Sequence, residues 1–234
     1  MTVRMNLLSH DETVALLLSL KVAAVAVACT LPPAIACAWL LARKRFLGKV
    51  LLETAILLPL ILPPVVTGYA LLALFGHQGA IGRVLEALHL SIAFRWTGAA
   101  LAAGVMAFPL LVVALRSAFE SVDRKLEQAA ATLGAGAWRI FSGITLPLSL
   151  RGLVAGLALA FARAFGEFGA TITFVSSIPG QTRTLPIALY ELLETPGGES
   201  GALRLTWVAL VVALVATLGA ALLLRSGPRA EPDA

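Results

Sequence analysis

The chain has 234 residues, of which 59% are hydrophobic and 13% charged, with a formal net charge of +5. Ordinary soluble domains contain about 45–50% apolar and about 25% charged residues, so this composition argues against a soluble globular protein and points to the lipid bilayer as solvent. The basic residues form no stripe with interleaved aromatic residues, so nucleic acid is not an expected partner.

Long apolar stretches predict the transmembrane helices, because a span needs about 20 consecutive apolar residues. Five stretches qualify, at residues 13–41, 50–75, 97–118, 148–165 and 203–224. The fourth is the least regular, since Arg163 and Glu167 stand near its end and a further apolar run, 170–175, follows. We therefore predict an all-α membrane protein whose transmembrane domain covers 13–225, with five spans and a polar tail at 226–234. A sixth span or a re-entrant helix at 170–175 stays open.

The distribution of Lys and Arg predicts the orientation, because these residues mark cytoplasmic loops. The basic run 43–45 follows the first span, and we place that loop inside the cell. The N-terminus is then outside, and the loop 120–147 and the C-terminus are cytoplasmic. Most of the 18 Lys and Arg residues then lie inside. The first stretch exceeds the about 7–15 apolar residues of a signal-peptide core, so it is expected to be a retained span.

The loop 120–147 is too polar to span a membrane and too regular to be a linker. Ser121 and Asp123 can cap a helix start, and Gly134 is a natural helix end. The apolar side chains beyond this glycine are Trp138, Ile140, Phe141 and Ile144, which make a second helix amphipathic. The pattern predicts two short helices joined by a glycine elbow. Their periodicity alone also fits a surface helix lying on the lipid interface.

The same loop resembles the signature of ABC-importer permeases, which reads Glu-Ala-Ala, three residues, Gly, nine residues, Ile, one residue and Leu-Pro. The sequence departs from it at the glutamate position, which holds Gln128, with Glu127 one residue earlier. The resemblance implies an ABC importer permease fold, in which this loop forms cytoplasmic coupling helices that dock a separate ATPase subunit. The coupling residues it implies are Glu127, Gln128, Ala129, Ala130, Gly134, Trp138, Ile144 and Pro147.

Residues for ATP chemistry are missing from the sequence. A phosphate-binding loop reads Gly-x-x-x-x-Gly-Lys-Ser/Thr, and the single Gly-Lys pair here, Gly48-Lys49, is followed by Val50. We therefore expect no catalytic residue and no cofactor in this chain, with ATP used by the partner subunit, of which the resemblance implies two copies. The histidines are scattered at His10, His77 and His89, so no metal site is expected.

Three further segments, at residues 62–76, 162–171 and 181–190, look like molybdate-importer permeases. The resemblance implies a homodimer in the cytoplasmic (inner) membrane that carries molybdate and receives it from an extracytoplasmic molybdate-binding protein. Sulfate, thiosulfate and tungstate stay as alternative substrates, because the Gly-Glu-Phe-Gly-Ala stretch at 166–170 is shared with sulfate and thiosulfate permeases. An ion-coupled secondary carrier is less favoured, because inverted repeats and titratable groups near the midplane are not evident.

Two groups of residues are candidates for the pathway or its gate. Pro63 and Pro64 interrupt the second span and free backbone groups that could line a cavity, beside the hydroxyls of Thr67 and Tyr69. The second group consists of Arg163 and Glu167, which stand four residues apart and so can pair on one helix face. A structural ion pair near the outer gate is the preferred interpretation, and contact of Arg163 with the passing anion is the alternative.

Overall fold

The computed structural model describes residues 8–225 of the chain, so the tail predicted at 226–234 lies outside the described residues. The helices are α1 (His10–Arg43), α2 (Lys49–Ile61), α3 (Pro64–Phe75), α4 (Ala80–Ala87), α5 (Trp96–Glu120), α6 (Arg124–Thr132), α7 (Ala137–Ile140), the π-helix η1 (Phe141–Thr145), α8 (Leu146–Phe165), α9 (Gly169–Val175), α10 (Leu185–Glu194) and α11 (Glu199–Arg225). Residues 8–225 contain no β-strand, and the predicted all-α fold class is confirmed.

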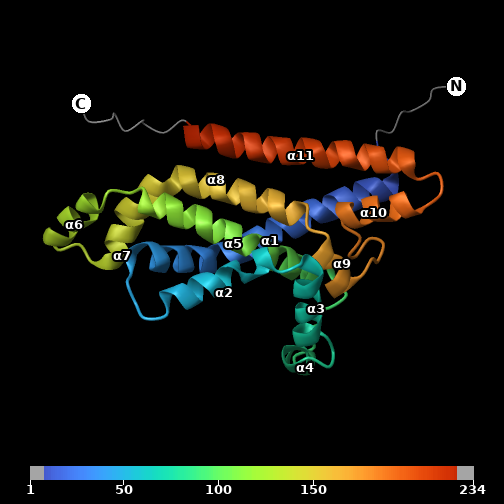
Figure 1. Cartoon of the computed structure of the whole chain (residues 1–234), viewed down its shortest axis with the longest axis horizontal. Helices are drawn as coiled ribbons and strands as arrows, with labels where there is room; N and C mark the ends of the chain where they lie inside the picture. Colours follow the sequence, from blue (N-terminus) through green and yellow to red (C-terminus); the bar gives the residue numbers. More distant parts are fainter. Residues whose placement is uncertain (1–7, 226–234) are drawn as a thin grey trace.

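The long helices α1, α5, α8 and α11 run side by side along the long axis of the molecule (Figure 1). Helices α6 and α7 project at one end of this bundle, and α10 lies near the other (Figure 1). Four helices of the described chain are long and apolar enough to cross a membrane, at His10–Arg43, Trp96–Glu120, Ala137–Phe165 and Glu199–Leu222. The bent pair α2–α3 makes a fifth if it counts as one span.

The stretch 50–75 forms two helices that meet at a sharp bend. Helix α2 ends at Ile61, α3 begins at Pro64, and their axes are bent by 110°. Pro63 causes the break, since proline has no N–H to donate to the preceding turn and disfavours helical backbone in the residue before it. Leu62 accordingly has an extended conformation, with φ −68° and ψ 145°. The stretch is therefore a broken element, which carries α3 away from the bundle.

The apolar run 170–175 lies in α9, which has seven residues. At 1.5 Å per residue the helix is about 10 Å long, too short to cross about 30 Å of hydrocarbon. Helix α9 packs against α3 through glycine: a Cβ added to Gly68 would lie 2.5 Å from the carbonyl oxygen of Ala170, and one added to Gly169 would lie 2.8 Å from Cβ of Pro64. The two short helices thus form a close pair.

Small side chains build the interior of the bundle. Ala99, Ala102 and Ala103 of α5 are fully buried. A Cβ added to Gly152 of α8 would lie 2.5 Å from Cβ of Ala118 on α5. In a membrane, close backbone approach supplies the packing energy that the hydrophobic effect supplies in water. The glycine of α8 therefore serves contact within this chain.

An ion pair joins the beginnings of α1 and α11. The guanidinium of Arg204 donates to both carboxylate oxygens of Glu12, at 2.7 and 3.3 Å. Glu12 is buried, and its carboxylate also accepts the backbone N–H of Ser9, which caps α1. The two helices are therefore held together at this end by a charge-assisted contact.

Candidate functional site

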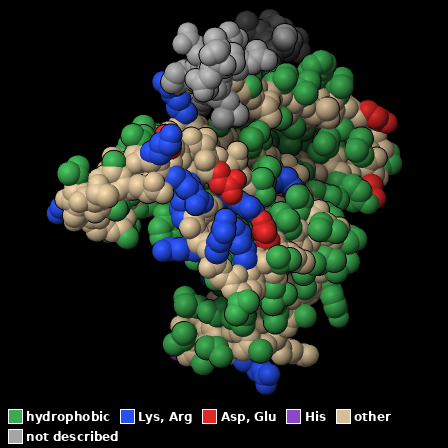
Figure 2. Space-filling view, turned by 60° about the vertical axis from the view of Figure 1, so that its left-hand side comes forward, with side chains coloured by type: hydrophobic (Ala, Val, Ile, Leu, Met, Phe, Trp, Pro, Cys, Tyr) green, Lys and Arg blue, Asp and Glu red, His purple; other side chains and the backbone are tan. Residues whose placement is uncertain are grey.

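The end of the bundle that carries α6 and α7 is rich in basic side chains. Figure 2 views the molecule from this side and shows Lys and Arg gathered near the centre, with acidic side chains among them. Asp123 begins α6 by accepting the backbone N–H of Lys125 at 2.8 Å. Arg116 of α5 pairs with Glu120 at 2.8 Å and also with Glu53, which ties α2 to α5. Charge at this end is therefore partly paired within the chain.

A left-handed glycine forms the elbow between α6 and α7. Gly134 has a φ of +84°, a conformation that side chains of L-residues rarely adopt, and a Cβ added there would meet no atom within 4 Å. The residue before it, Leu133, exposes 88% of its surface. Glycine is thus needed here for its backbone conformation, and the elbow leaves the side chain of Leu133 exposed.

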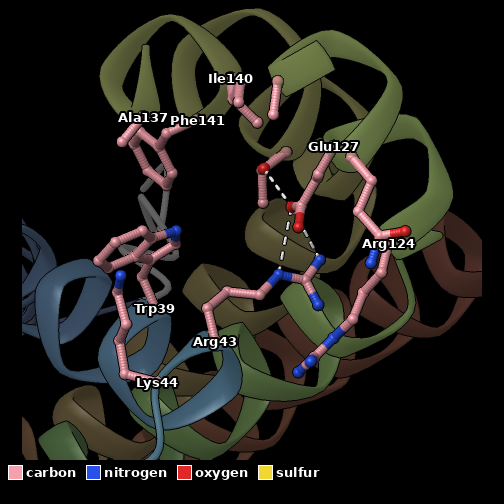
Figure 3. Close-up of a pocket in the computed structure, with 11 residues that line it drawn as sticks. Trp39, Arg43, Lys44, Arg124, Glu127, Ala137, Ile140 and Phe141 are labelled. Carbon is pink, nitrogen blue, oxygen red and sulfur yellow. Dashed lines mark hydrogen bonds and ion pairs between the residues drawn. The ribbon is translucent and has the colours of Figure 1, made fainter. Parts of the chain in front are cut away.

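Glu127 connects α6 to two other elements (Figure 3). Its Oε1 lies 3.0 Å from Nη2 of Arg43, at the end of α1, and accepts the hydroxyl of Thr145 in η1 at 2.6 Å. The side chains of Arg43 and Glu127 are only 8% and 17% exposed. Arg43 also donates to the carbonyl of Val122, at 3.2 Å. The carboxylate therefore holds α1, α6 and η1 together from within the chain.

The other residues of the predicted coupling set differ in how far they are exposed on the surface of the chain. Gln128, Ala129, Trp138 and Pro147 are exposed, and Ala130 and Ile144 are partly buried. Trp138 packs against Phe141, with ring centroids 5.7 Å apart, and lines an apolar groove against α1. Gln128 and Ala129 lie on α6 with Glu127, and both are exposed.

Arg163 and Glu167 form the ion pair that their spacing predicts, at 2.5 Å. The carboxylate of Glu167 also accepts the N–H of Ala170 at 2.9 Å, at the start of α9. The side chain of Glu167 is 2% exposed and that of Arg163 is 28% exposed. The pair thus occupies the junction between α8 and α9, and Pro64 lies against Gly169, two residues further on.

The two hydroxyl-bearing pathway candidates on α3 differ in exposure. Thr67 is buried, and its hydroxyl has no hydrogen-bond partner among the described residues. Tyr69 on the same helix is 67% exposed. Phe168 packs on Tyr190, with ring centroids 5.1 Å apart. The hydrogen bond that Tyr190 donates to Glu194 raises the pKa of its phenol above the ordinary value.

Sequence reasoning missed Arg43 and Thr145 as partners of Glu127. Arg43 stands 84 residues from Glu127, and nothing local in the sequence marks the contact. The one available signal is its position in a loop, 43–45, that is predicted to lie on the same side of the membrane as the loop 120–147. Within residues 8–225, no group of three or more His, Cys, Asp or Glu side chains is arranged to hold a metal ion.

Comparison with known proteins identifies a family and close relatives. The family model "Binding-protein-dependent transport system inner membrane component" matches residues 34–230. The molybdenum transport system permease protein ModB of Escherichia coli (strain K12) is 57% identical over 213 residues, covering 91% of this chain and 93% of that protein. The sulfate transport system permease protein CysW of Synechococcus elongatus is 37% identical over 187 residues, covering 79% and 65%.

A solved structure has the same fold. The crystal structure of an amino acid ABC transporter with histidines aligns with a TM-score of 0.59 and 16% sequence identity, covering 92% of this chain and 91% of the other. At this identity the likeness concerns the fold alone.

Proposed function

The chain belongs to the family of binding-protein-dependent transport system inner membrane components, and from this membership we propose that it is the permease subunit through which an ATP-driven importer carries molybdate across the cytoplasmic membrane. The 57% identity to a molybdenum transport permease, over nearly the whole of both chains, supports this substrate. Members of the family work with an ATPase and with a substrate-binding partner. The chain is a transport subunit and not itself an enzyme.

The loop 120–147 is the surface on which we propose that the ATPase docks. Its exposed elbow carries the proposal: Gly134 turns the backbone, and Leu133 stands 88% exposed at the tip. Leu133 is therefore accessible to a partner, and we propose that it enters a hydrophobic pocket of the ATPase. Gln128 and Ala129 are exposed on α6, and the partly buried Ile144 and the exposed Pro147 stand where the loop passes into the next span.

A homodimer with two ATPase subunits and an extracytoplasmic molybdate-binding protein completes the proposed importer. Four or five spans make too small a bundle to enclose a regulated pathway, and apolar side chains such as Val50, Leu51 and Ile61 of α2 are strongly exposed. These side chains suit contact with lipid or with a second copy. Mass measurement by light scattering in detergent, with and without the ATPase, gives the copy numbers.

The orientation that we propose puts the N-terminus outside and the loop 120–147 in the cytoplasm, following the basic residues at the α6–α7 end. Single cysteines at Leu133 and at His89, in a background where Cys29 and Cys37 are alanine, test this with a membrane-impermeant maleimide on intact cells. We expect His89→Cys to be labelled at once and Leu133→Cys only after the membrane is permeabilised. The opposite pattern would reverse the orientation.

Uptake by reconstituted vesicles tests the function as a whole. We expect radioactive molybdate to enter vesicles that hold the chain and its ATPase when ATP is inside and the binding protein outside. Uptake driven by an ion gradient without ATP would refute the importer and favour a secondary carrier.

Sulfate is the second candidate substrate, favoured by the 37% identity to a sulfate permease. Competition of unlabelled sulfate, thiosulfate and tungstate against molybdate in the same assay ranks the four anions. Equal competition by sulfate would move the assignment to sulfate.

A further inference from the structure

We propose that the chain has a binding site for one anionic phospholipid of the cytoplasmic leaflet, formed where α1 meets α7 and η1. The assignment of the leaflet rests on the proposed function, because it needs the α6–α7 end to be cytoplasmic. The site has two adjoining parts: an apolar groove on the flank of α1 and a basic pocket at its end.

The apolar part suits an acyl chain. The groove has a volume of about 580 Å³ and is lined by Pro32, Ile35, Ala36, Trp39, Ala137, Trp138, Phe141 and Leu146. Its lining contains almost no polar surface. From Pro32 to Trp39 it follows α1 for about 10 Å towards the bilayer interior. A groove of this kind holds hydrocarbon and offers nothing to a polar ligand.

The basic part lies directly beyond the groove, since the pocket and the groove share Trp39, Ala137 and Phe141 as lining residues. This pocket has a volume of about 280 Å³ and includes Lys44 and Arg124 in its wall (Figure 3). The Lys44 ammonium lies 5.5 Å from the centre of the Trp39 ring. The pocket and the groove are therefore neighbours, and a lipid with its headgroup phosphate in the pocket would reach the groove with an acyl chain past the rings of Trp39 and Phe141.

The charge of the pocket is positive and not fully compensated. Glu127 is its one acidic lining residue, and it is already paired with Arg43. Lys44 and Arg124 form no ion pair with any residue that the structure describes. Both side chains are exposed. An anionic headgroup supplies the missing net negative charge, whereas a zwitterionic headgroup carries no net charge.

Aromatic rings mark this level of the chain as the membrane surface. Trp39 packs edge-on against Phe141 at 6.2 Å, and Trp138 packs against the same ring from α7. Tryptophan is enriched at the level of lipid headgroups, where one end of the ring is apolar and the other is wet. The basic pocket therefore stands at headgroup depth, with the groove below it at acyl-chain depth.

Quenching of tryptophan fluorescence by brominated lipid tests the site, because Trp39 and Trp138 line the groove. In a Trp96→Phe/Trp207→Phe background they are the two tryptophans that remain of the four in the sequence. This chain, assembled with its ATPase, is placed in phosphatidylcholine vesicles that contain brominated phosphatidylglycerol or brominated phosphatidylcholine at the same mole fraction. We expect clearly stronger quenching by the brominated phosphatidylglycerol.

Variants that remove basic side chains distinguish binding at this pocket from a general attraction of the chain to an anionic membrane. Lys44→Gln/Arg124→Gln should abolish the preference for phosphatidylglycerol, with about a fivefold loss of lipid affinity for each basic side chain removed. Lys125→Gln/Arg139→Gln removes the same charge from exposed residues of the same loop that do not line the pocket, and should keep the preference. Lys44→Gln alone serves as the mild variant, since Arg124 also donates to the carbonyl of Ala42.

The apolar part has its own variant. Ala36 is exposed and lines the groove, so Ala36→Phe should fill it and weaken quenching by both brominated lipids.

Two results would overturn the site: equal quenching by the two lipids in the assembled complex, or equal loss of preference in both double variants. Quenching needs no transport, whereas molybdate uptake by the same vesicles tests the proposed function separately.

Discussion

Oε1 of Glu127 lies 3.0 Å from Nη2 of Arg43, a contact that spans 84 residues and joins α6 to the end of α1. The same oxygen accepts the hydroxyl of Thr145 at 2.6 Å, which adds η1 to the cluster. This carboxylate therefore ties the elbow to the bundle, together with the hydrogen bond that Arg124 donates to the carbonyl of Ala42. An ATPase that moves α6 must move α1 and η1 with it, or break this contact.

Glu127→Gln is expected to weaken both the folded state and the coupling of ATP hydrolysis to uptake. The substitution leaves the Arg43 guanidinium, 8% exposed, without its counter-charge, and removing one partner of a buried pair costs about 3 kcal/mol. Thermal unfolding of the purified chain and molybdate uptake by vesicles measure the two effects.

Gln128→Ala is the matched control for that variant, since Gln128 is the exposed neighbour that occupies the signature position. We expect it to leave the unfolding temperature unchanged. The Arg43→Gln/Glu127→Gln double variant should be less destabilised than the sum of the two single variants, because the side chains interact. Additive effects would mean that the pair makes no energetic contribution.

Gly134→Ala is expected to strain the elbow. A left-handed backbone costs an L-residue about 1–2 kcal/mol, and the φ of Gly134 is +84°. The conformation of the elbow should change, and the chain should stimulate ATP hydrolysis by the ATPase subunit less strongly. Insertion of the spans into the membrane should be unaffected. Gly136→Ala is the control, because Gly136 lies in the same loop with a φ of −71° and nothing within 4 Å of an added Cβ. Equal effects of both variants would remove the special role of Gly134.

Gly152→Ala is expected to push α8 away from α5. The new Cβ would lie 2.5 Å from Cβ of Ala118, an overlap that costs about 1–3 kcal/mol. The exchanged pair Gly152→Ala/Ala118→Gly should regain much of the lost stability, because the two helices again share one methyl group at the contact. Gly219→Ala on α11 is the control, with no atom near an added Cβ. Thermal unfolding in detergent measures all three variants.

Arg163→Gln and Glu167→Gln distinguish a structural pair from an anion contact. The buried Glu167 carboxylate caps α9 as well as binding Arg163, so both variants should lower the maximal rate of uptake and leave the KM for molybdate unchanged. A KM that rises several-fold in Arg163→Gln alone would assign Arg163 to the pathway. Uptake measured over a range of molybdate concentrations separates the two outcomes.

Features that depend on residues close together in the sequence were predicted correctly. Apolar runs of sufficient length set the spans, the two prolines at 63–64 break the second stretch, and the spacing of Arg163 and Glu167 allows their pair. Gly134 was recognisable as a helix end. The signature position, however, drew attention to Gln128, which is exposed, whereas the internal contact is made by Glu127 one residue earlier.

The rest depends on contacts between segments far apart in the chain. Nothing within the loop indicates that Arg43 lies against it, and the 110° bend between α2 and α3 is set by packing of α3 on α9 as well as by proline. The run 170–175 looks like the start of a span, but its length as a helix is limited by Ser176, whose φ is +58°. Such a backbone conformation is not evident from an apolar pattern.

Helix α1 is fastened at both ends, by Glu12 to Arg204 and by Arg43 to Glu127, while Pro32 and Pro33 interrupt its hydrogen bonding about two thirds of the way along. A helix with fixed ends bends most easily at such a weakened turn when one end is displaced. Motion of the elbow would therefore pass along α1 through the turn that Pro32 and Pro33 weaken. The apolar groove includes Pro32 in its lining, so an occupant of the groove would lie along this weakened segment of α1.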